Sequence, residues 1–307
     1  MLTLRSGMRR LFATAIASVM TLGLSAQALA LPVGTEEELR QAEEEALRNP
    51  PSWEELYAAS VDFTAIVALS NCSGSLVRFK SSKTSDYAMV LTNGHCVGGS
   101  FIKPGEARVD EASTRTFNLL PSSGSGTLGT LRASRLMYAT MTGTDMALYK
   151  LTSTYAQIAS RYRVAPLNIA DRHPAAGTAI RIPSGFWRRM YSCSIDRFVP
   201  ELREGGWTWK DSIRYTQPGC AVIGGTSGSP IVSADSYEVI GINNTGNESG
   251  GRCTVNNPCE VDSMGNVTFE KGASYGQQLY PIYGCLKDDG SIDLSLTTCT
   301  LQKPASP

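Results

Sequence analysis

The chain has 307 residues, of which 42% are hydrophobic and 18% charged, so it can bury the core of one large domain or two small ones. Basic and acidic residues number 28 each; without residues 1–30, which hold three arginines and no acid, 25 basic residues face 28 acidic ones, a net charge of −3. The sequence has no basic tract of the kind that would indicate nucleic-acid binding, and its only long apolar stretch lies at the N-terminus.

Residues 1–30 have the pattern of an export signal. "MLTLRSGMRR" is basic, "LFATAIASVMTLGL" is apolar, and "SAQALA" ends in small residues. The apolar stretch is shorter than the roughly 20 residues that a membrane-spanning helix needs. We therefore expect cleavage after Ala30 rather than an anchor, and a secreted protein, extracellular or periplasmic, with no further membrane segment.

Residues 31–57 form an acidic segment with helical spacing. Between residues 36 and 55 there are eight acids and two arginines, apolar residues recur at helical spacing, and "NPP" at 49–51 ends the helix. Two interpretations remain open. The segment is either a solvated N-terminal extension or a pro-segment that is removed or displaced when a zymogen matures.

From residue 58 to residue 285 the chain consists of short apolar or alternating runs. "FTAIVALSNCSGSLVRF" and "DYAMVLTNGHCV" flank the polar "KSSKTS" at 80–85, which predicts a hairpin. Further runs are "MALYKLTS", "TAIRIPSG", "SIRYTQ", "PIVSA" and "YEVIGINN", and no long amphipathic helix interrupts them. This pattern predicts an all-β sandwich or barrels, with residues 153–168 linking two halves.

Three polar residues are candidates for catalysis. His95 follows an apolar strand in "VLTNGHCVGG", beside Cys96, and imidazole titrates near neutrality as a general base must. Asp145, in "GTDMALYKL", adjoins a core strand, where a carboxylate is costly unless it is paired; a turn cap is the alternative. Ser227 lies in "AVIGGTSGSPIV". The second histidine, His173, lies in a polar Pro/Gly loop and is expected to be structural.

The order of these three residues separates known classes of serine hydrolase. An α/β-hydrolase has its histidine after the serine, and none follows Ser227. A subtilisin-like order needs an acid before His95, where Asp62 and Asp86 lack a suitable setting. His95, then Asp145, then Ser227 is the chymotrypsin order.

The motifs themselves carry a family resemblance. "LTNGHCV", "GTDMALYKL" and "GGTSGSPIV" resemble the three signature segments of trypsin-like serine endopeptidases, and Gly-Thr-Ser-Gly-Ser-Pro resembles the secreted bacterial branch that includes glutamyl endopeptidases. The resemblance covers roughly residues 60–285. It implies two six-stranded antiparallel β-barrels with the active site in the cleft between them, the first at 58–160, the second at 161–285, and a tail at 286–307.

The resemblance also implies a mechanism. Ser227 would attack a peptide carbonyl, His95 would take its proton, and Asp145 would orient the ring, with the backbone N–H groups of Gly225 and Ser227 as the oxyanion hole. No cofactor or metal is implied, and the expected partners are polypeptide substrates of a monomer. The alternatives are an inactive secreted binding protein on a protease scaffold, another serine hydrolase such as an esterase, and a structural envelope protein.

Eight cysteines fit an oxidising compartment. None forms a Cys-x-x-Cys pair, which argues against zinc, and eight cysteines allow 105 connectivities. "NCSGSLV" matches the family's cysteine-bearing strand, which implies a Cys72–Cys96 disulfide. Pairing of nearest neighbours predicts Cys193–Cys220, Cys253–Cys259 and Cys285–Cys299.

Five residues are expected to bind substrate: Ala221, Val222, Asn243, Asn244 and Gly246. By the resemblance, Ala221 and Val222 lie at the base of the primary specificity pocket, and Asn243 stands where glutamyl endopeptidases have a histidine. We expect cleavage after uncharged residues of small or medium size, with Glu as the runner-up. Thr226 replaces the aspartate that pairs with a new N-terminal ammonium in digestive relatives, so no such switch is expected.

Overall fold

The computed structural model describes residues 37, 40–41, 44, 48 and 62–305. The predicted signal peptide at 1–30 lies outside these residues, as does most of the acidic segment at 31–57. Within the described part of the chain, no helix is both long enough and apolar enough to cross a membrane.

The first sheet closes on itself. Its six antiparallel strands pair in the order β1 (Ile66–Ala68), β5 (Thr116–Leu119), β6 (Gly129–Thr140), β7 (Met146–Thr154), β3 (Tyr87–Thr92) and β2 (Ser73–Arg78), and β2 returns to β1. Two strands extend this barrel: β4 (Ala107–Ala112) pairs with β6, and β8 (Leu167–Asn168) runs parallel to β2.

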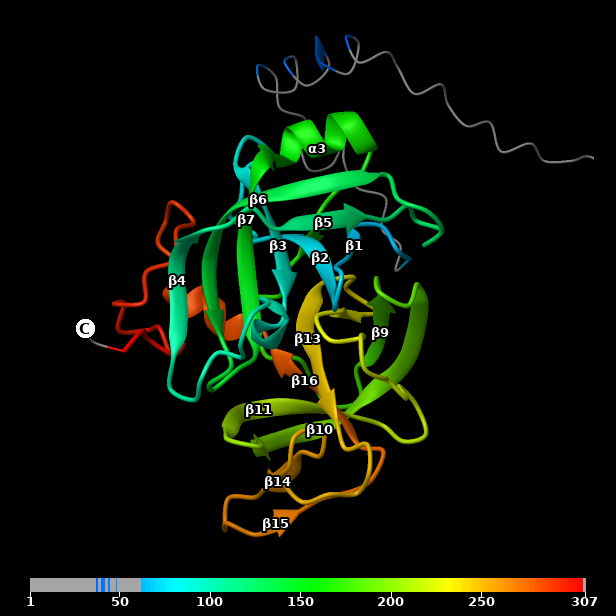
Figure 1. The fold of residues 1–307 in the computed structure, drawn as a ribbon, viewed down its shortest axis with the longest axis vertical. Helices are drawn as coiled ribbons and strands as arrows, with labels where there is room; N and C mark the ends of the chain where they lie inside the picture. Colours follow the sequence, from blue (N-terminus) through cyan, green and yellow to red (C-terminus); the bar gives the residue numbers. More distant parts are fainter. Residues whose placement is uncertain (1–36, 38–39, 42–43, 45–47, 49–61, 306–307) are drawn as a thin grey trace, which may run out of the picture. The chain divides into compact units, whose positions relative to one another are not determined.

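The second sheet closes in the same way. Its strands pair in the order β11 (Trp207–Tyr215), β16 (Ser274–Gln278), β13 (Val239–Gly246), β12 (Pro230–Ser233), β9 (Ala179–Ser184) and β10 (Arg189–Glu204), and β10 returns to β11. A short ribbon of β14 (Cys259–Val261) and β15 (Val267–Thr268) extends from β10. The all-β fold of two antiparallel barrels that the sequence predicts is confirmed (Figure 1).

Helical structure in the two-barrel region is short. The helical elements are the 3₁₀ turns η1 (Gly94–Cys96) and η2 (Tyr280–Cys285) and the α-helix α3 (Tyr155–Tyr162). α3 lies within the expected link at 153–168 and begins with a capping box between Thr154 and Gln157. The hairpin predicted at 80–85 joins β2 to β3.

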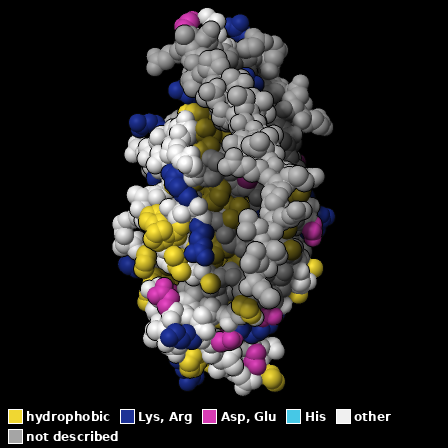
Figure 2. Space-filling view, turned by 90° about the vertical axis from the view of Figure 1, so that its right-hand side faces the viewer, with side chains coloured by type: hydrophobic (Ala, Val, Ile, Leu, Met, Phe, Trp, Pro, Cys, Tyr) yellow, Lys and Arg dark blue, Asp and Glu magenta, His cyan; other side chains and the backbone are white. Residues whose placement is uncertain are grey.

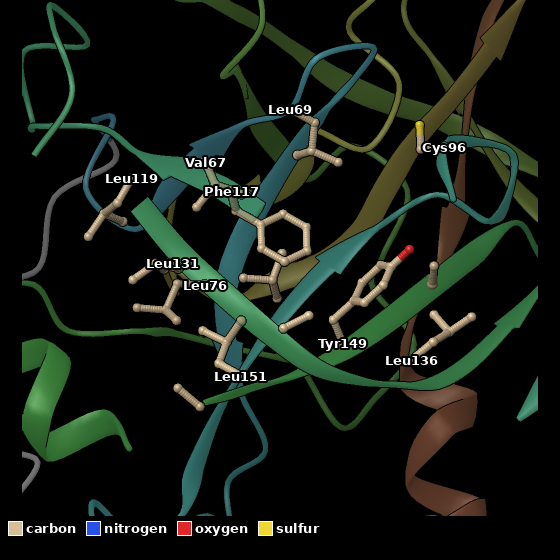
Figure 3. Packing of buried hydrophobic residues seen from close by; sticks show 14 of the residues in the cluster. Val67, Leu69, Leu76, Cys96, Phe117, Leu119, Leu131, Leu136, Tyr149 and Leu151 are labelled. Carbon is tan, nitrogen blue, oxygen red and sulfur yellow. The ribbon is translucent and has the colours of Figure 1, made fainter. Parts of the chain in front are cut away.

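Adjacent residues of the central strands enter two different cores. Leu76 and Tyr149 point into the first barrel, where they pack with Phe117, Leu119 and Leu131 (Figure 3). Val90 belongs to the same cluster. Their neighbours Val77, Leu91 and Leu148 point the opposite way and pack with Val232, Val239 and Ile242 of the second barrel. Successive side chains of a strand face opposite sides of the sheet, so both faces here are apolar and the strands have continuous apolar sequences.

The segment after Cys285 also belongs to the core. The Cys285–Cys299 disulfide folds it back, and Leu301 is buried in the cluster between the barrels. The hydroxyl of Tyr138 in β6 donates to the carbonyl oxygen of Gln302 at 2.9 Å. The predicted tail is therefore packed on the first barrel. On the described part of the face in Figure 2, Lys and Arg side chains lie among Asp, Glu and hydrophobic ones.

Candidate functional site

His95 is held at the end of β3 by a tight turn. The 3₁₀ turn Gly94–Cys96 follows the strand, and the Cys72–Cys96 disulfide joins it to the start of β2. A Cβ on Gly94 would overlap the carbonyl of Thr140, so only glycine allows this approach. The turn places the imidazole beside Asp145, the residue that precedes β7.

Asp145 uses both carboxylate oxygens to hold His95. Its Oδ2 lies 2.7 Å from Nδ1 of His95, and its Oδ1 accepts the backbone N–H of His95 at 3.1 Å. Asp145 is 0% exposed, and a buried carboxylate of this kind persists only when it is paired. The contact fixes the ring and leaves Nε2 as the free nitrogen.

The electrostatics of this pair favour the imidazolium. Burial alone would lower the pKa of His95, but the charge of Asp145, its hydrogen bond and the charge of Glu204 outweigh burial and raise the pKa above the usual 6.5. A raised pKa makes His95 a stronger base once it is neutral. Such a group can accept a proton from a neighbouring hydroxyl.

Ser227 lies on a turn between the barrels. Its carbonyl oxygen accepts the N–H of Ser73 in the first barrel at 2.8 Å, and it lines the same cavity as His95 and Asp145. Within residues 62–305, no hydrogen bond joins Ser227 to His95, because the Ser227 hydroxyl donates to the carbonyl oxygen of Asn244 at 3.3 Å. Catalytic hydrogen bonds are often loose before substrate binds.

Two backbone donors flank the hydroxyl. The N–H groups of Gly225 and Ser227 have no acceptor among the described residues, whereas the intervening Thr226 N–H bonds to the carbonyl oxygen of Ile223 at 3.0 Å. Gly225 has φ +89, a conformation that favours glycine. A pair of unbonded amides beside a hydroxyl can stabilise an oxyanion.

The cavity has a volume of about 420 Å³. All five residues expected to bind substrate line it: Ala221, Val222, Asn243, Asn244 and Gly246. Asn243, however, is only 1% exposed, accepts from the Tyr215 hydroxyl at 3.0 Å and donates to Thr226 at 3.1 Å. Its amide is engaged by the protein, which leaves it poorly placed to bind a substrate carboxylate.

The sequence interpretation missed Glu204. This residue ends β10, lines the cavity and is 7% exposed, and its carboxylate accepts from the Thr245 hydroxyl at 2.5 Å and the Asn256 N–H at 2.8 Å. Burial raises its pKa. No local motif marks Glu204, because only the return of β10 to the cavity places it there.

An aromatic pair beside His95 was also missed. The Phe101 ring lies 6.3 Å from the His95 ring and 5.7 Å from the Trp207 ring, both in edge-on contact, and both aromatic residues line the cavity. They add apolar surface next to the imidazole.

The remaining candidates lie elsewhere or are engaged. His173 contacts Asp211 at 3.1 Å and Gln278 at 3.0 Å and is not among the residues that line the cavity, in keeping with a structural role. Cys72 and Cys96 lie near His95 as a possible metal cluster, but disulfide sulfurs are not thiolate ligands. The structure contains all four expected pairs: Cys72–Cys96, Cys193–Cys220, Cys253–Cys259 and Cys285–Cys299.

The chain was compared with protein-family models, curated proteins and solved structures. The model of the trypsin-like peptidase domain matches residues 72–242, whereas no curated protein matches the chain. Among solved structures, the chain is similar to the MamO protease domain from Magnetospirillum magneticum (15% identity, 73% of this chain and 96% of that chain, TM-score 0.45). It is also similar to the Rv3671c protease from M. tuberculosis (14% identity, 78% of this chain and 82% of that chain, TM-score 0.42). A third similar structure is the thermostable serine protease AL20 from an extremophilic microorganism (17% identity, 69% of this chain and 88% of that chain, TM-score 0.39).

Proposed function

The chain belongs to the trypsin-like peptidase family, and from this membership we propose that it is a serine endopeptidase that works through an acyl-enzyme. One observation carries the proposal. His95 and the buried Asp145, which are in contact at 2.7 Å, line the same cavity as Ser227. The N–H groups of Ser227 and of Gly225, two residues before it, have no acceptor among the described residues. This set of groups supplies a nucleophile, a base, an orienting acid and an oxyanion site.

The proposed reaction has two halves. The Ser227 hydroxyl oxygen bonds to the scissile carbonyl carbon while its proton passes to Nε2 of His95, and the carbonyl oxygen becomes an oxyanion that accepts the N–H groups of Gly225 and Ser227. The C–N bond then breaks, and the amine leaves with the proton from His95. Water, deprotonated by His95, releases the acyl group and restores the Ser227 hydroxyl.

Substitution of Ser227 tests this proposal. Ser227→Ala should keep the fold and lower turnover of casein by several orders of magnitude, because the hydroxyl is the bond-forming group. Turnover and the melting temperature should be measured on the same preparation. Near-parental activity in a folded Ser227→Ala variant would show that the nucleophile lies elsewhere.

A second candidate is an inactive binding protein on the same scaffold. It is favoured by one contact, the 3.3 Å hydrogen bond that turns the Ser227 hydroxyl toward Asn244 rather than His95. The two candidates differ in a simple measurement. An inactive scaffold would show no casein turnover even before substitution.

For the primary pocket we propose cleavage after uncharged residues of small or medium size. Ala221 and Val222, which the resemblance places at the base of the pocket, supply no charge there, and a buried lysine or arginine side chain without a partner is costly. Glu204 lines the same cavity, but its carboxylate already accepts from Thr245 and Asn256. The engaged amide of Asn243 weakens the case for Glu, the runner-up. A peptide-library profile dominated by Arg or Lys at the cleaved position would refute this specificity, and one dominated by Glu would favour the runner-up.

We propose that the protein is exported, acts on polypeptides as a monomer, and needs no cofactor. The apolar N-terminal run and the four disulfides support export. The engaged, uncharged Thr226 supports an oxyanion loop that is ordered without a buried N-terminal ammonium. N-terminal sequencing of active extracellular protein should find Leu31 if residues 31–57 are an extension, and a residue after 57 if they are a pro-segment that is removed. If activity required a newly formed, buried N-terminus, the proposal that the oxyanion loop is ordered without an N-terminal ammonium would be contradicted.

A further inference from the structure

Two exposed aromatic residues sit beside the loop that precedes Ser227. They occupy the turn between β9 and β10, where Phe186 is 37% and Trp187 is 48% exposed. Both lie against Gly225: a Cβ there would come within 2.8 Å of the Phe186 ring and 2.9 Å of Trp187 Nε1. The turn is therefore packed on the segment that supplies one oxyanion donor.

Trp187 makes a directed contact with this segment. Its indole N–H donates to the carbonyl oxygen of Gly224 at 2.7 Å. In a trans peptide the carbonyl and the following N–H point in opposite directions, so holding the Gly224 oxygen also aims the Gly225 N–H. With the carbonyl turned to Trp187, that N–H points away from the indole and stays unbonded among the described residues.

The Gly224–Gly225 peptide needs such a restraint. Glycine populates positive and negative φ with similar ease, so a pair of glycines allows the peptide plane to rotate. On the far side of Gly225, the Ser73 hydroxyl of the first barrel donates to the Gly225 carbonyl oxygen at 3.2 Å. All of these contacts are uncharged.

We propose that Trp187 is a positioning residue that holds the Gly224–Gly225 peptide with the Gly225 N–H directed at the developing oxyanion. The inference rests on the proposed peptidase function and deepens it. In digestive relatives, an ion pair between an aspartate and the new N-terminal ammonium orders this loop, and Thr226 stands in place of that aspartate here. In this chain the hydrogen bond from the neutral indole has that role. The indole contributes through the peptide and does not touch the reacting atoms.

Trp187→Phe tests the tie, because it keeps an aromatic ring and removes the N–H. In the full mature chain we expect kcat on a peptide amide to fall roughly ten- to a hundredfold, since one oxyanion donor loses its orientation, with KM nearly unchanged. The inhibition constant of a peptide aldehyde, which forms a tetrahedral oxyanion on the serine, should rise in parallel. The melting temperature should stay near that of the parent because the side chain is half exposed.

Phe186→Leu is the matched control. It alters the same aromatic turn but keeps the indole bond, so its kcat and aldehyde binding should remain close to parental values. If both substitutions raised KM and left kcat and aldehyde binding unchanged, the turn would serve substrate binding and the positioning role would be overturned. An unchanged kcat in Trp187→Phe, in a parent protein that cleaves peptides, would overturn this inference alone. A parent protein that cleaves nothing would overturn both proposals.

Discussion

Glu204 lines the cavity, and its negative charge affects the pKa of His95. Its charge is one of the influences that raise the pKa of the imidazole, although Asp145 contributes more. In the proposed mechanism His95 accepts a proton and must be neutral, so activity should be lost as the pH falls through the pKa of His95. A raised pKa therefore places the acid limb of kcat/KM above the ordinary imidazole value of 6.5.

Glu204→Gln should move that acid limb to lower pH. Removal of the negative charge lowers the pKa of His95, and glutamine still offers an oxygen to Thr245 or Asn256. The pH profile of kcat/KM measures the shift. Glu201→Gln is the control on the same strand, because Glu201 pairs with Lys210 and Arg203 and does not line the cavity. Equal shifts in both variants, or none in Glu204→Gln, would contradict the role of Glu204.

At the level of elements, the Cys72–Cys96 disulfide does more than hold the fold together. It spans 24 residues and ties the turn that carries His95 to β2, whereas Cys285–Cys299 spans 14 residues and holds the C-terminal segment. Loop closure on this scale stabilises a protein by about 3 kcal/mol. Both disulfides should therefore raise the free energy of unfolding, whereas only Cys72–Cys96 should also affect kcat.

Paired Cys→Ala substitutions separate these effects. Cys72→Ala/Cys96→Ala should lower both the free energy of unfolding and kcat, since His95 loses its tether. Cys285→Ala/Cys299→Ala should lower the free energy of unfolding by a similar amount and leave kcat near the parental value. Denaturant unfolding and steady-state kinetics below the transition measure the two quantities. A parental kcat in the first variant would show that the tether does not position His95.

Strand sequences revealed the fold class because each barrel strand is an apolar run between polar turns. The run "DYAMVLTN" at 86–93 shows why the detail was harder to foresee. Met89 and Leu91 face the second barrel while Val90 faces the first, so no alternation marks which side is inside. The packing of the C-terminal segment was harder to foresee because its apolar residues are scattered among polar ones. Leu286, Ile292, Leu294, Leu296 and Leu301 pack on a cluster that includes Tyr138 of β6 and Ile282 of η2, which lie far from them or in another element.

For the whole molecule, the site exists only where the two barrels meet. His95 and Asp145 come from the first barrel and Ser227 from the second, and the Ser73 N–H bond to the Ser227 carbonyl spans the junction. These three residues stand in short motifs, so the sequence could single them out. Glu204 ends β10 in "REGGWTW", and Trp187 precedes its start in "SGFWRR". Neither segment is a recognisable motif, because only the folded barrel brings Glu204 to the cavity and Trp187 to the Gly224 carbonyl.

Covalent labelling of Ser227 tests its role as the nucleophile most directly. The mature chain is incubated with a peptidyl phosphonate ester carrying an uncharged side chain at the position before the reactive phosphorus, and the adduct is located by intact-mass measurement and peptide mapping. We expect one adduct per chain, on Ser227, with none in Ser227→Ala and a much slower reaction in His95→Ala. A folded parent protein that forms no adduct, or forms it on another residue, would contradict the assignment of Ser227 as a nucleophile activated by His95.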